Sequence, residues 1–136
     1  MEFVWPIRVY YEDTDAGGVV FYANYLRFME RARTEWLRSL GFEQDALMRD
    51  PGVLFAVRRT EVDYLTPGRF NDLLKVSSRV VQLRGATLTF EQRIVSDDDA
   101  QRELCRGRVT VACLDSDSMR PTRIPSAIRE KIPATE

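Results

Sequence analysis

The sequence contains no histidine. This absence excludes Ser-His-Asp and Cys-His catalysis, metal sites built on imidazole, and every histidine general base. Any catalysis must therefore rely on carboxylates, hydroxyls, lysine or arginine side chains, or backbone dipoles. A metal held by carboxylates alone would need clustered Asp and Glu, and no run in the chain has the spacing of a known carboxylate loop. We therefore expect no metal or redox cofactor.

Cysteine is nearly as scarce, with Cys105 and Cys113 as the only two. Both fall in one strand-like segment, where eight residues of extended chain separate them by about 26 Å, too far for a disulfide. Without histidine they also make a poor zinc set. The sequence predicts two reduced thiols.

The sequence also lacks a dominant charge and any long apolar run. It carries 20 basic and 21 acidic residues, so no overall field favours nucleic acid or a membrane surface as a partner. No apolar stretch approaches the roughly 20 residues that a membrane-spanning helix needs, and the N-terminal region lacks the features of a signal peptide. A chain of 136 residues suits one hydrophobic core. We therefore expect one domain over residues 1–136, cytoplasmic and without membrane insertion.

The longest predicted helix runs from about residue 22 to residue 40, because apolar residues recur there at intervals of three and four. These apolar residues are Tyr25, Phe28, Met29, Ala32, Trp36, Leu37 and Leu40. Gly41 is a natural stop for this helix. A first strand is expected over 3–13, a short second helix over 43–50, and a final helical turn within 125–132.

Beyond Pro51 the apolar period changes to two, which predicts strands. The strand-like runs are 53–65, 72–83, 86–96 and 102–115. The breaks between the last three runs are short enough to close antiparallel hairpins. Because one sheet cannot leave so apolar a helix exposed, the sheet should wrap around it. The pattern predicts the α+β class: a curved five-stranded antiparallel sheet around a long central helix, which is the hotdog fold.

The segment before the long helix holds the candidate chemistry. Asp15 stands in a turn, followed by Gly17 and Gly18 and then by the helix start near Tyr22. Adjacent glycines allow positive φ angles and close approach of a ligand, while the helix start offers unpaired N–H groups and the positive end of its dipole. A carboxylate beside such donors suits acyl transfer, because the donors polarise a thioester carbonyl while the carboxylate attacks it or activates water. The alternative is structural, since Asp13 and Asp15 also fit a turn that only caps the local backbone.

The run TDAGGVVFYANY at 14–25 resembles the active-site signature of the 4-hydroxybenzoyl-CoA thioesterase family. The stretches at 30–37 and 57–74 and the Arg-Gly hairpin at 84–85 are similar to its Tol–Pal-associated acyl-CoA thioesterase branch. The resemblance covers most of the chain. It implies a hotdog thioesterase that hydrolyses short-chain, medium-chain or aromatic acyl-CoA to free acid and CoA, without a cofactor.

The resemblance also implies roles for residues and an assembly. The family's catalytic carboxylate falls on Asp15, and its helix-start residue, whose backbone N–H polarises the thioester carbonyl, falls on Tyr22. Gly18 offers a second backbone N–H for the oxyanion. Many members of the Tol–Pal-associated branch carry histidine where Tyr22 stands, whereas the founding enzyme carries tyrosine, and the main-chain donor tolerates either. A homodimer with paired sheets and the site between subunits is implied, and often a homotetramer.

Other candidates concern substrate binding. Asn24 could orient the helix start for the substrate or serve only the local structure. Tyr64, Thr66 and Pro67 lie at the end of a long strand and could shape the pocket or pack in the core. Guanidinium groups suit the CoA phosphates, and the alternative for each is a solvated surface role. The arginine candidates are Arg58, Arg59, Arg69, Arg84 and Arg123.

Two rival functions belong to other classes. The first is a non-catalytic module that binds acyl-CoA or acyl carrier protein and is associated with the cell-envelope Tol–Pal system. The second is a structural partner in an envelope complex. A hotdog dehydratase is disfavoured, since that chemistry normally relies on histidine. We expect acyl-CoA as the substrate, and acyl carrier protein is a further candidate partner.

Overall fold

The structure, a computed structural model, describes residues 2–132. Its elements in chain order are β1 (Phe3–Arg8), the 3₁₀ turn η1 (Tyr11–Asp13), α1 (Tyr22–Ser39), α2 (Gln44–Arg49), β2 (Val53–Tyr64), β3 (Leu73–Leu83), β4 (Thr87–Ser96), β5 (Glu103–Asp115) and α3 (Ser126–Arg129). The long helix, the short second helix and the four later strands are confirmed. The final helical turn forms over fewer residues than the predicted stretch.

The prediction that the first strand reaches residue 13 is wrong. β1 ends at Arg8, which lies opposite Leu73, the first residue of its only partner strand. The chain then turns, because the Asp13 carboxylate accepts the Tyr10 N–H at 2.8 Å and the Asp13 N–H donates to the Tyr10 carbonyl at 3.0 Å. A local side-chain acceptor thus replaces the ladder partner that the sheet no longer offers.

The sheet has five antiparallel strands in the order β1-β3-β4-β5-β2. The two predicted hairpins, β3–β4 and β4–β5, are present. β2 does not pair with β3, which follows it in sequence, but with β5. β1 and β2 are therefore the two edge strands, and each has one side of its backbone unpaired by the sheet.

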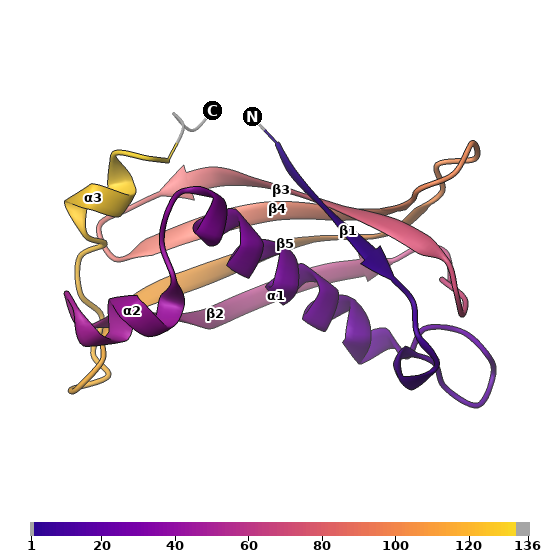
Figure 1. The fold of residues 1–136 in the computed structure, drawn as a ribbon, viewed down its shortest axis with the longest axis horizontal. Helices are drawn as coiled ribbons and strands as arrows, with labels where there is room; N and C mark the ends of the chain where they lie inside the picture. The colour runs from indigo at the N-terminus through magenta and orange to yellow at the C-terminus, as the bar shows by residue number, and fades with distance from the viewer. Residues whose placement is uncertain (1, 133–136) are drawn as a thin grey trace.

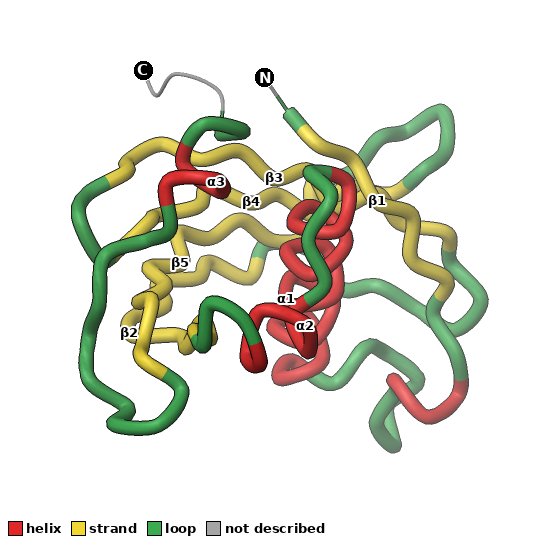
Figure 2. The backbone as a smooth tube through the Cα atoms, turned by 60° about the vertical axis from the view of Figure 1, so that its left-hand side comes forward, coloured by secondary structure: helices red, strands yellow, loops and turns green. Residues whose placement is uncertain are grey.

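Helix α1 lies across one face of the sheet, and the curved sheet passes around it (Figure 1). The tube view shows α1 and α2 on the same side of the strands (Figure 2). Two groups of buried side chains fill the space between, one around Phe28 and Met29 and one around Trp36 and Leu37. This is the α+β hotdog arrangement that the sequence predicted. Burial of the apolar stripe of α1 stabilises it.

Two further expectations concern the cysteines and the membrane. Cys105 and Cys113 are both buried and free, as expected for thiols too far apart to pair. No helix within residues 2–132 is long and apolar enough to cross a membrane.

Candidate active site

A small hairpin carries Asp15. Thr14 and Val20 form an antiparallel bridge, and inside it the Asp15 N–H donates to the Val19 carbonyl at 2.9 Å. The turn closes with the Gly18 N–H donating to the Asp15 carbonyl at 3.0 Å, and Gly18 has a φ of 79°, a conformation that glycine adopts without strain. The glycines that follow Asp15 therefore shape the loop that presents it.

The Asp15 carboxylate is exposed, and one of its oxygens is fixed by the turn. Oδ1 accepts the Gly17 N–H at 2.9 Å. A Cβ at position 17 would lie 3.3 Å from the same oxygen, tighter than usual contact, so the loop favours glycine there. Within residues 2–132, Oδ2 of Asp15 has no hydrogen-bond partner. The carboxylate is thus oriented by one bond and keeps a free oxygen for chemistry.

The start of α1 is open on its N-terminal side. Phe21 is the N-cap residue, with extended backbone angles and no side-chain cap. The Asn24 N–H donates to the Phe21 carbonyl at 2.8 Å. In the described part of the chain, neither the Tyr22 N–H nor the Ala23 N–H has a partner. These unpaired N–H groups, at the positive end of the helix dipole, can donate hydrogen bonds to a developing oxyanion.

The structure places Gly18 differently from the prediction. Its N–H already donates to the Asp15 carbonyl, so in this conformation it is not free for an oxyanion. The donors that remain are those of Tyr22 and its neighbour. Sequence spacing could not show this, because it does not reveal which N–H closes the turn.

Asn24 serves the local structure. Its side chain is buried, and its Nδ2 donates to the Asp13 carbonyl at 2.8 Å. The same carbonyl accepts the Phe21 N–H at 2.9 Å. The buried Asp13 therefore joins η1 to the first turn of α1, and it fixes where the helix begins relative to Asp15. The predicted contact of Asn24 with substrate is not what its amide does in this structure.

The segment at Gly68 and Arg69 pairs with the hairpin that carries Asp15. Val19 pairs with Arg69, and the Val20 N–H donates to the Gly68 carbonyl at 2.8 Å. The Gly68 N–H in turn donates to the Tyr25 hydroxyl at 2.9 Å. A Cβ at Gly68 would lie 2.8 Å from Leu104, so only glycine fits. From the sequence, Tyr25 was expected only on the apolar face of the long helix, and Gly68 falls in the gap between the predicted strands 53–65 and 72–83. The sequence did not predict their role in positioning the site, and the glycine in that gap was its one signal.

Tyr64 lies beside the helix start. Its ring meets Tyr22 edge-on with centroids 6.0 Å apart and lies 5.8 Å from the Tyr25 ring. Tyr22 and Tyr64 are 62% and 46% exposed, so this aromatic surface is open next to the unpaired N–H groups. Burial raises the pKa of the Tyr25 and Tyr64 hydroxyls, which keeps both neutral over a wider pH range. Thr66 is tied to the neighbouring strand, its N–H donating to the Leu104 carbonyl at 3.1 Å.

The five arginines considered for the CoA phosphates lie in three different places in the structure. Arg69 lies on the segment that pairs with the Asp15 hairpin. Arg58 and Arg59 lie in the middle of β2, and Arg59 forms an exposed ion pair with Glu61 at 3.1 Å. Arg84 and Arg123 lie at the β3–β4 turn, where Arg123 is near Gly85. β3 begins at Leu73, just after the segment that holds the Asp15 hairpin, and its 11 residues extend about 33 Å to that turn. Within one chain, Arg84 and Asp15 therefore stand at opposite ends of the sheet.

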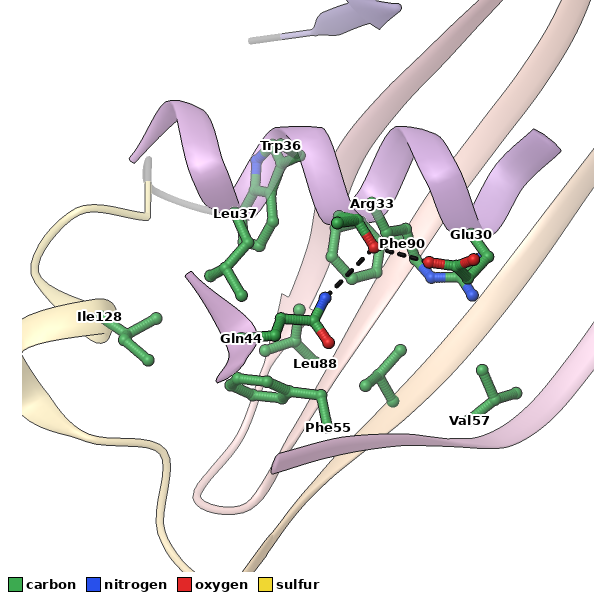
Figure 3. Close-up of a pocket in the computed structure, with 12 residues that line it drawn as sticks. Glu30, Arg33, Trp36, Leu37, Gln44, Phe55, Val57, Leu88, Phe90 and Ile128 are labelled. Atoms are coloured by element: carbon green, nitrogen blue, oxygen red, sulfur yellow. Dashed lines mark hydrogen bonds between the residues drawn. The ribbon is translucent and has the colours of Figure 1, made fainter. Parts of the chain in front are cut away.

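A cavity of about 110 Å³ lies between the C-terminal half of α1 and the sheet (Figure 3). Its wall is mostly apolar, with polar groups along one rim. The lining residues are Glu30, Arg33, Thr34, Trp36, Leu37, Gln44, Phe55, Val57, Leu88, Phe90, Val111 and Ile128. Phe28, Trp36 and Phe90 are buried, and the last two also face this cavity.

The arrangement offers no obvious metal ligands. Within residues 2–132, no three His, Cys, Asp or Glu side chains come close enough to hold a metal ion. What the site does present is a free carboxylate oxygen, an open helix start and an exposed aromatic surface.

Comparison with known proteins points to one family. A model of the thioesterase-like superfamily matches residues 9–132. The chain is 44% identical over 127 residues to the acyl-CoA thioesterase YbgC of Haemophilus influenzae, covering 93% of this chain and 91% of that protein. It is 47% identical over 126 residues to the acyl-CoA thioester hydrolase YbgC of Escherichia coli, covering 93% and 92%.

Solved structures agree on the fold. A probable thioesterase from Bartonella henselae superimposes with a TM-score of 0.86 at 34% identity, covering 92% of this chain and 100% of that one. A 4-hydroxybenzoyl-CoA thioesterase bound to 4-hydroxybenzoyl-CoA gives a TM-score of 0.90 at 14% identity, covering 97% and 99%. At that identity the likeness concerns the fold alone.

Proposed function

This chain belongs to the thioesterase-like superfamily and hydrolyses acyl-CoA thioesters, and we propose that Asp15 supplies the carboxylate and Tyr22 the main-chain donor for that reaction. Two observations carry this assignment: among residues 2–132 Asp15 keeps one carboxylate oxygen without a hydrogen-bond partner, and the Tyr22 N–H at the start of α1 has no acceptor. The hairpin bonds hold the two groups on one rigid segment.

The reaction needs a donor for the carbonyl oxygen and a base or nucleophile for its carbon. The thioester carbonyl would accept the Tyr22 N–H, and the helix dipole would stabilise negative charge as it develops on the oxygen. In one route Asp15 takes a proton from water, the water oxygen bonds to the carbonyl carbon, and the C–S bond breaks. In the other, Asp15 itself bonds to that carbon as the thiolate leaves, and water then hydrolyses the mixed anhydride. In both routes CoA leaves as a thiolate that takes up a proton.

A homodimer through β2 is part of the proposal. β2 is a 12-residue edge strand, and the open backbone of such a strand favours pairing with a second copy. Val57 and Tyr64 on it are exposed apolar residues. Light scattering of the purified protein would test the dimer. A monomer at all concentrations would remove this part of the proposal and leave the chemistry standing.

Replacement of Asp15 by asparagine tests the catalytic assignment. Asp15→Asn retains the shape of the side chain and an oxygen that can accept the Gly17 N–H, but removes the base. We expect kcat for thiol release from acyl-CoA to fall at least 100-fold while the unfolding curve stays near that of the wild type. Glu12→Gln, an exposed carboxylate in the same region, is the matched control and should retain activity. Wild-type turnover in Asp15→Asn would refute the assignment. Wild-type protein that binds acyl-CoA without releasing thiol would instead support the non-catalytic binding module.

A further inference from the structure

The cavity beneath α1 continues as a groove toward the start of the helix. A second hollow lies along the same side of α1, lined by Leu26, Arg27, Glu30, Arg33, Val57, Thr60 and Val109. It shares Glu30, Arg33 and Val57 with the cavity, so the two form one trough between α1 and β2. The end of the trough nearest the helix start is at Leu26, four residues after Tyr22, which is about one helical turn. The trough therefore runs from about one turn beyond the open helix start to the cavity.

The polar groups at the cavity rim are already engaged with one another. The Thr34 hydroxyl donates to Glu30 at 2.6 Å, and the Gln44 amide donates to the Thr34 hydroxyl at 3.2 Å (Figure 3). The Arg33 guanidinium donates to the Gln92 side-chain oxygen at 3.0 Å. A ligand in the cavity therefore does not have to satisfy the carboxylate of Glu30 or the amide of Gln44. The remaining wall consists of hydrocarbon and aromatic surface.

The far end of the cavity is closed by apolar side chains. Trp36 meets Phe90 edge-on with ring centroids 4.9 Å apart. Leu37, Leu88 and Ile128 complete this end, and all are buried. An apolar cavity of this kind gains from a ligand that replaces water with hydrocarbon.

The distance along the trough sets the length of its ligand. Twelve residues of α1 separate Tyr22 from Thr34, which at about 1.5 Å per residue is about 18 Å. An extended hydrocarbon advances about 1.3 Å per carbon, given C–C bonds of about 1.52 Å. A chain whose carbonyl lies at the Tyr22 N–H therefore needs roughly 14 carbons to reach the middle of the cavity.

We propose that this trough binds a linear long-chain acyl group of roughly 12 to 16 carbons, with its thioester at Tyr22 and its methyl end in the cavity beside Trp36 and Leu88. The proposal rests on the proposed thioesterase function and extends the expected substrates beyond short and medium chains. Each methylene that enters the apolar part should raise kcat/KM about three- to fourfold. A polar or branched acyl group gains no such increase.

Val57 is the position at which to block the trough. It lines both hollows and is 52% exposed within one chain, so a larger side chain there does not have to displace the core. Because Val57 also lies on the β2 edge of the proposed dimer, Val57→Trp is used only if light scattering shows that it keeps the oligomeric state of the wild type. Val4 on β1, the other edge strand, is 48% exposed and lines neither hollow, which makes Val4→Trp a matched control. Val57→Ala controls for any change to β2 itself.

The measurement is kcat/KM for acyl-CoA substrates from butyryl to hexadecanoyl, below their micelle concentrations. We expect kcat/KM for tetradecanoyl-CoA to exceed that for butyryl-CoA by roughly 100-fold or more in the wild type, because four methylenes in the apolar part already give that factor. We expect this ratio to fall at least tenfold in Val57→Trp. Val4→Trp and Val57→Ala should keep the wild-type ratio. A ratio near one in the wild type, or one that Val57→Trp leaves unchanged, overturns the proposal.

A binding measurement tests the long-chain trough independently of the proposed catalytic role of Asp15. Calorimetric titration of Asp15→Asn with tetradecanoyl-CoA and butyryl-CoA reports the trough without turnover. Tighter binding of the long chain, lost in the Asp15→Asn, Val57→Trp double variant, supports the trough even if the wild type releases no thiol. Equal affinity for both substrates overturns the trough even if the wild type is an active thioesterase.

Discussion

The Tyr25 hydroxyl accepts a hydrogen bond from the Gly68 N–H at 2.9 Å, across 43 residues of sequence. Both groups are buried, and the Gly68 carbonyl on the other side of the same residue accepts the Val20 N–H at 2.8 Å. One residue thus links helix α1 to the hairpin that carries Asp15. The link therefore helps to position the hairpin that carries the proposed site.

Tyr25→Phe should loosen that link. The substitution keeps the ring but leaves the Gly68 N–H buried without an acceptor, which costs about 1 to 3 kcal/mol. We expect the free energy of unfolding in urea to fall by that amount and kcat for thiol release to fall more than KM rises. Trp5→Phe, an aromatic replacement on β1 outside this link, serves as the comparison. Unchanged stability and kcat in Tyr25→Phe would show that the bond does not position the site.

Gly17 and Gly18 should respond differently to alanine. A Cβ at Gly17 presses on Oδ1 of Asp15, so Gly17→Ala should lower kcat about tenfold or more and change stability little. Gly18 has open space around its Cβ position but a φ of 79°, so Gly18→Ala should cost about 1 to 2 kcal/mol of stability. Steady-state kinetics and urea unfolding of both variants check this contrast. Equal effects of the two variants on kcat and on stability would contradict it.

Asn24→Leu tests the buried connection between η1 and α1. The leucine removes the donor to the Asp13 carbonyl while filling a similar volume. That carbonyl keeps the Phe21 N–H, so we expect a moderate loss of about 1 to 2 kcal/mol in the free energy of unfolding. Asn24→Asp should be worse, because it places a buried carboxylate against a carbonyl oxygen. Circular dichroism during thermal unfolding gives the order of stability. If Asn24→Leu instead keeps full stability and loses only substrate affinity, the contact with substrate predicted from the sequence is the better account.

The buried thiols predict how stability depends on pH. Burial raises the pKa of Cys105 to about 12 and that of Cys113 to about 11, whereas an unfolded thiol titrates near 8.5. The folded state therefore keeps protons that the unfolded state loses, and this stabilisation is complete below about pH 8.5 and is lost as the pH rises toward the folded values. The expected slope is roughly 1 kcal/mol per pH unit for each thiol.

Urea unfolding between pH 7.5 and pH 10 measures that slope. Cys105→Ala should reduce it by about half, whatever its effect on stability at pH 7.5. Tyr25 and Tyr64, whose pKa values burial also raises, add a loss of the same sign only above about pH 10. Stability that does not change between pH 8.5 and pH 10 would contradict the prediction.

Some elements of the fold follow from neighbouring residues, whereas others depend on contacts with residues far away in the sequence. The spacing of apolar residues in α1 and the alternation along β3, β4 and β5 are properties of neighbouring residues, so periodicity alone predicted these elements. The first strand was predicted too long, because Val9 and Tyr10 continue an extended pattern. After Arg8 the regular ladder gives way to backbone bonds between Val9 and the turn at Asn71 and Asp72, and the Asp13 carboxylate then turns the chain by accepting the Tyr10 N–H.

By itself the sequence determined the α+β class, the elements, the absence of histidine chemistry and the candidate pair of Asp15 and Tyr22. It determined these because propensity, periodicity and motif spacing are local properties of the chain. Only the tertiary structure decided that β2 pairs with β5, that Gly68 meets Tyr25, that the Asn24 amide donates to the Asp13 carbonyl, and that Arg84 lies at the far end from Asp15. Those outcomes depend on which distant backbone groups satisfy one another when the sheet closes around α1, and no local pattern specifies that choice.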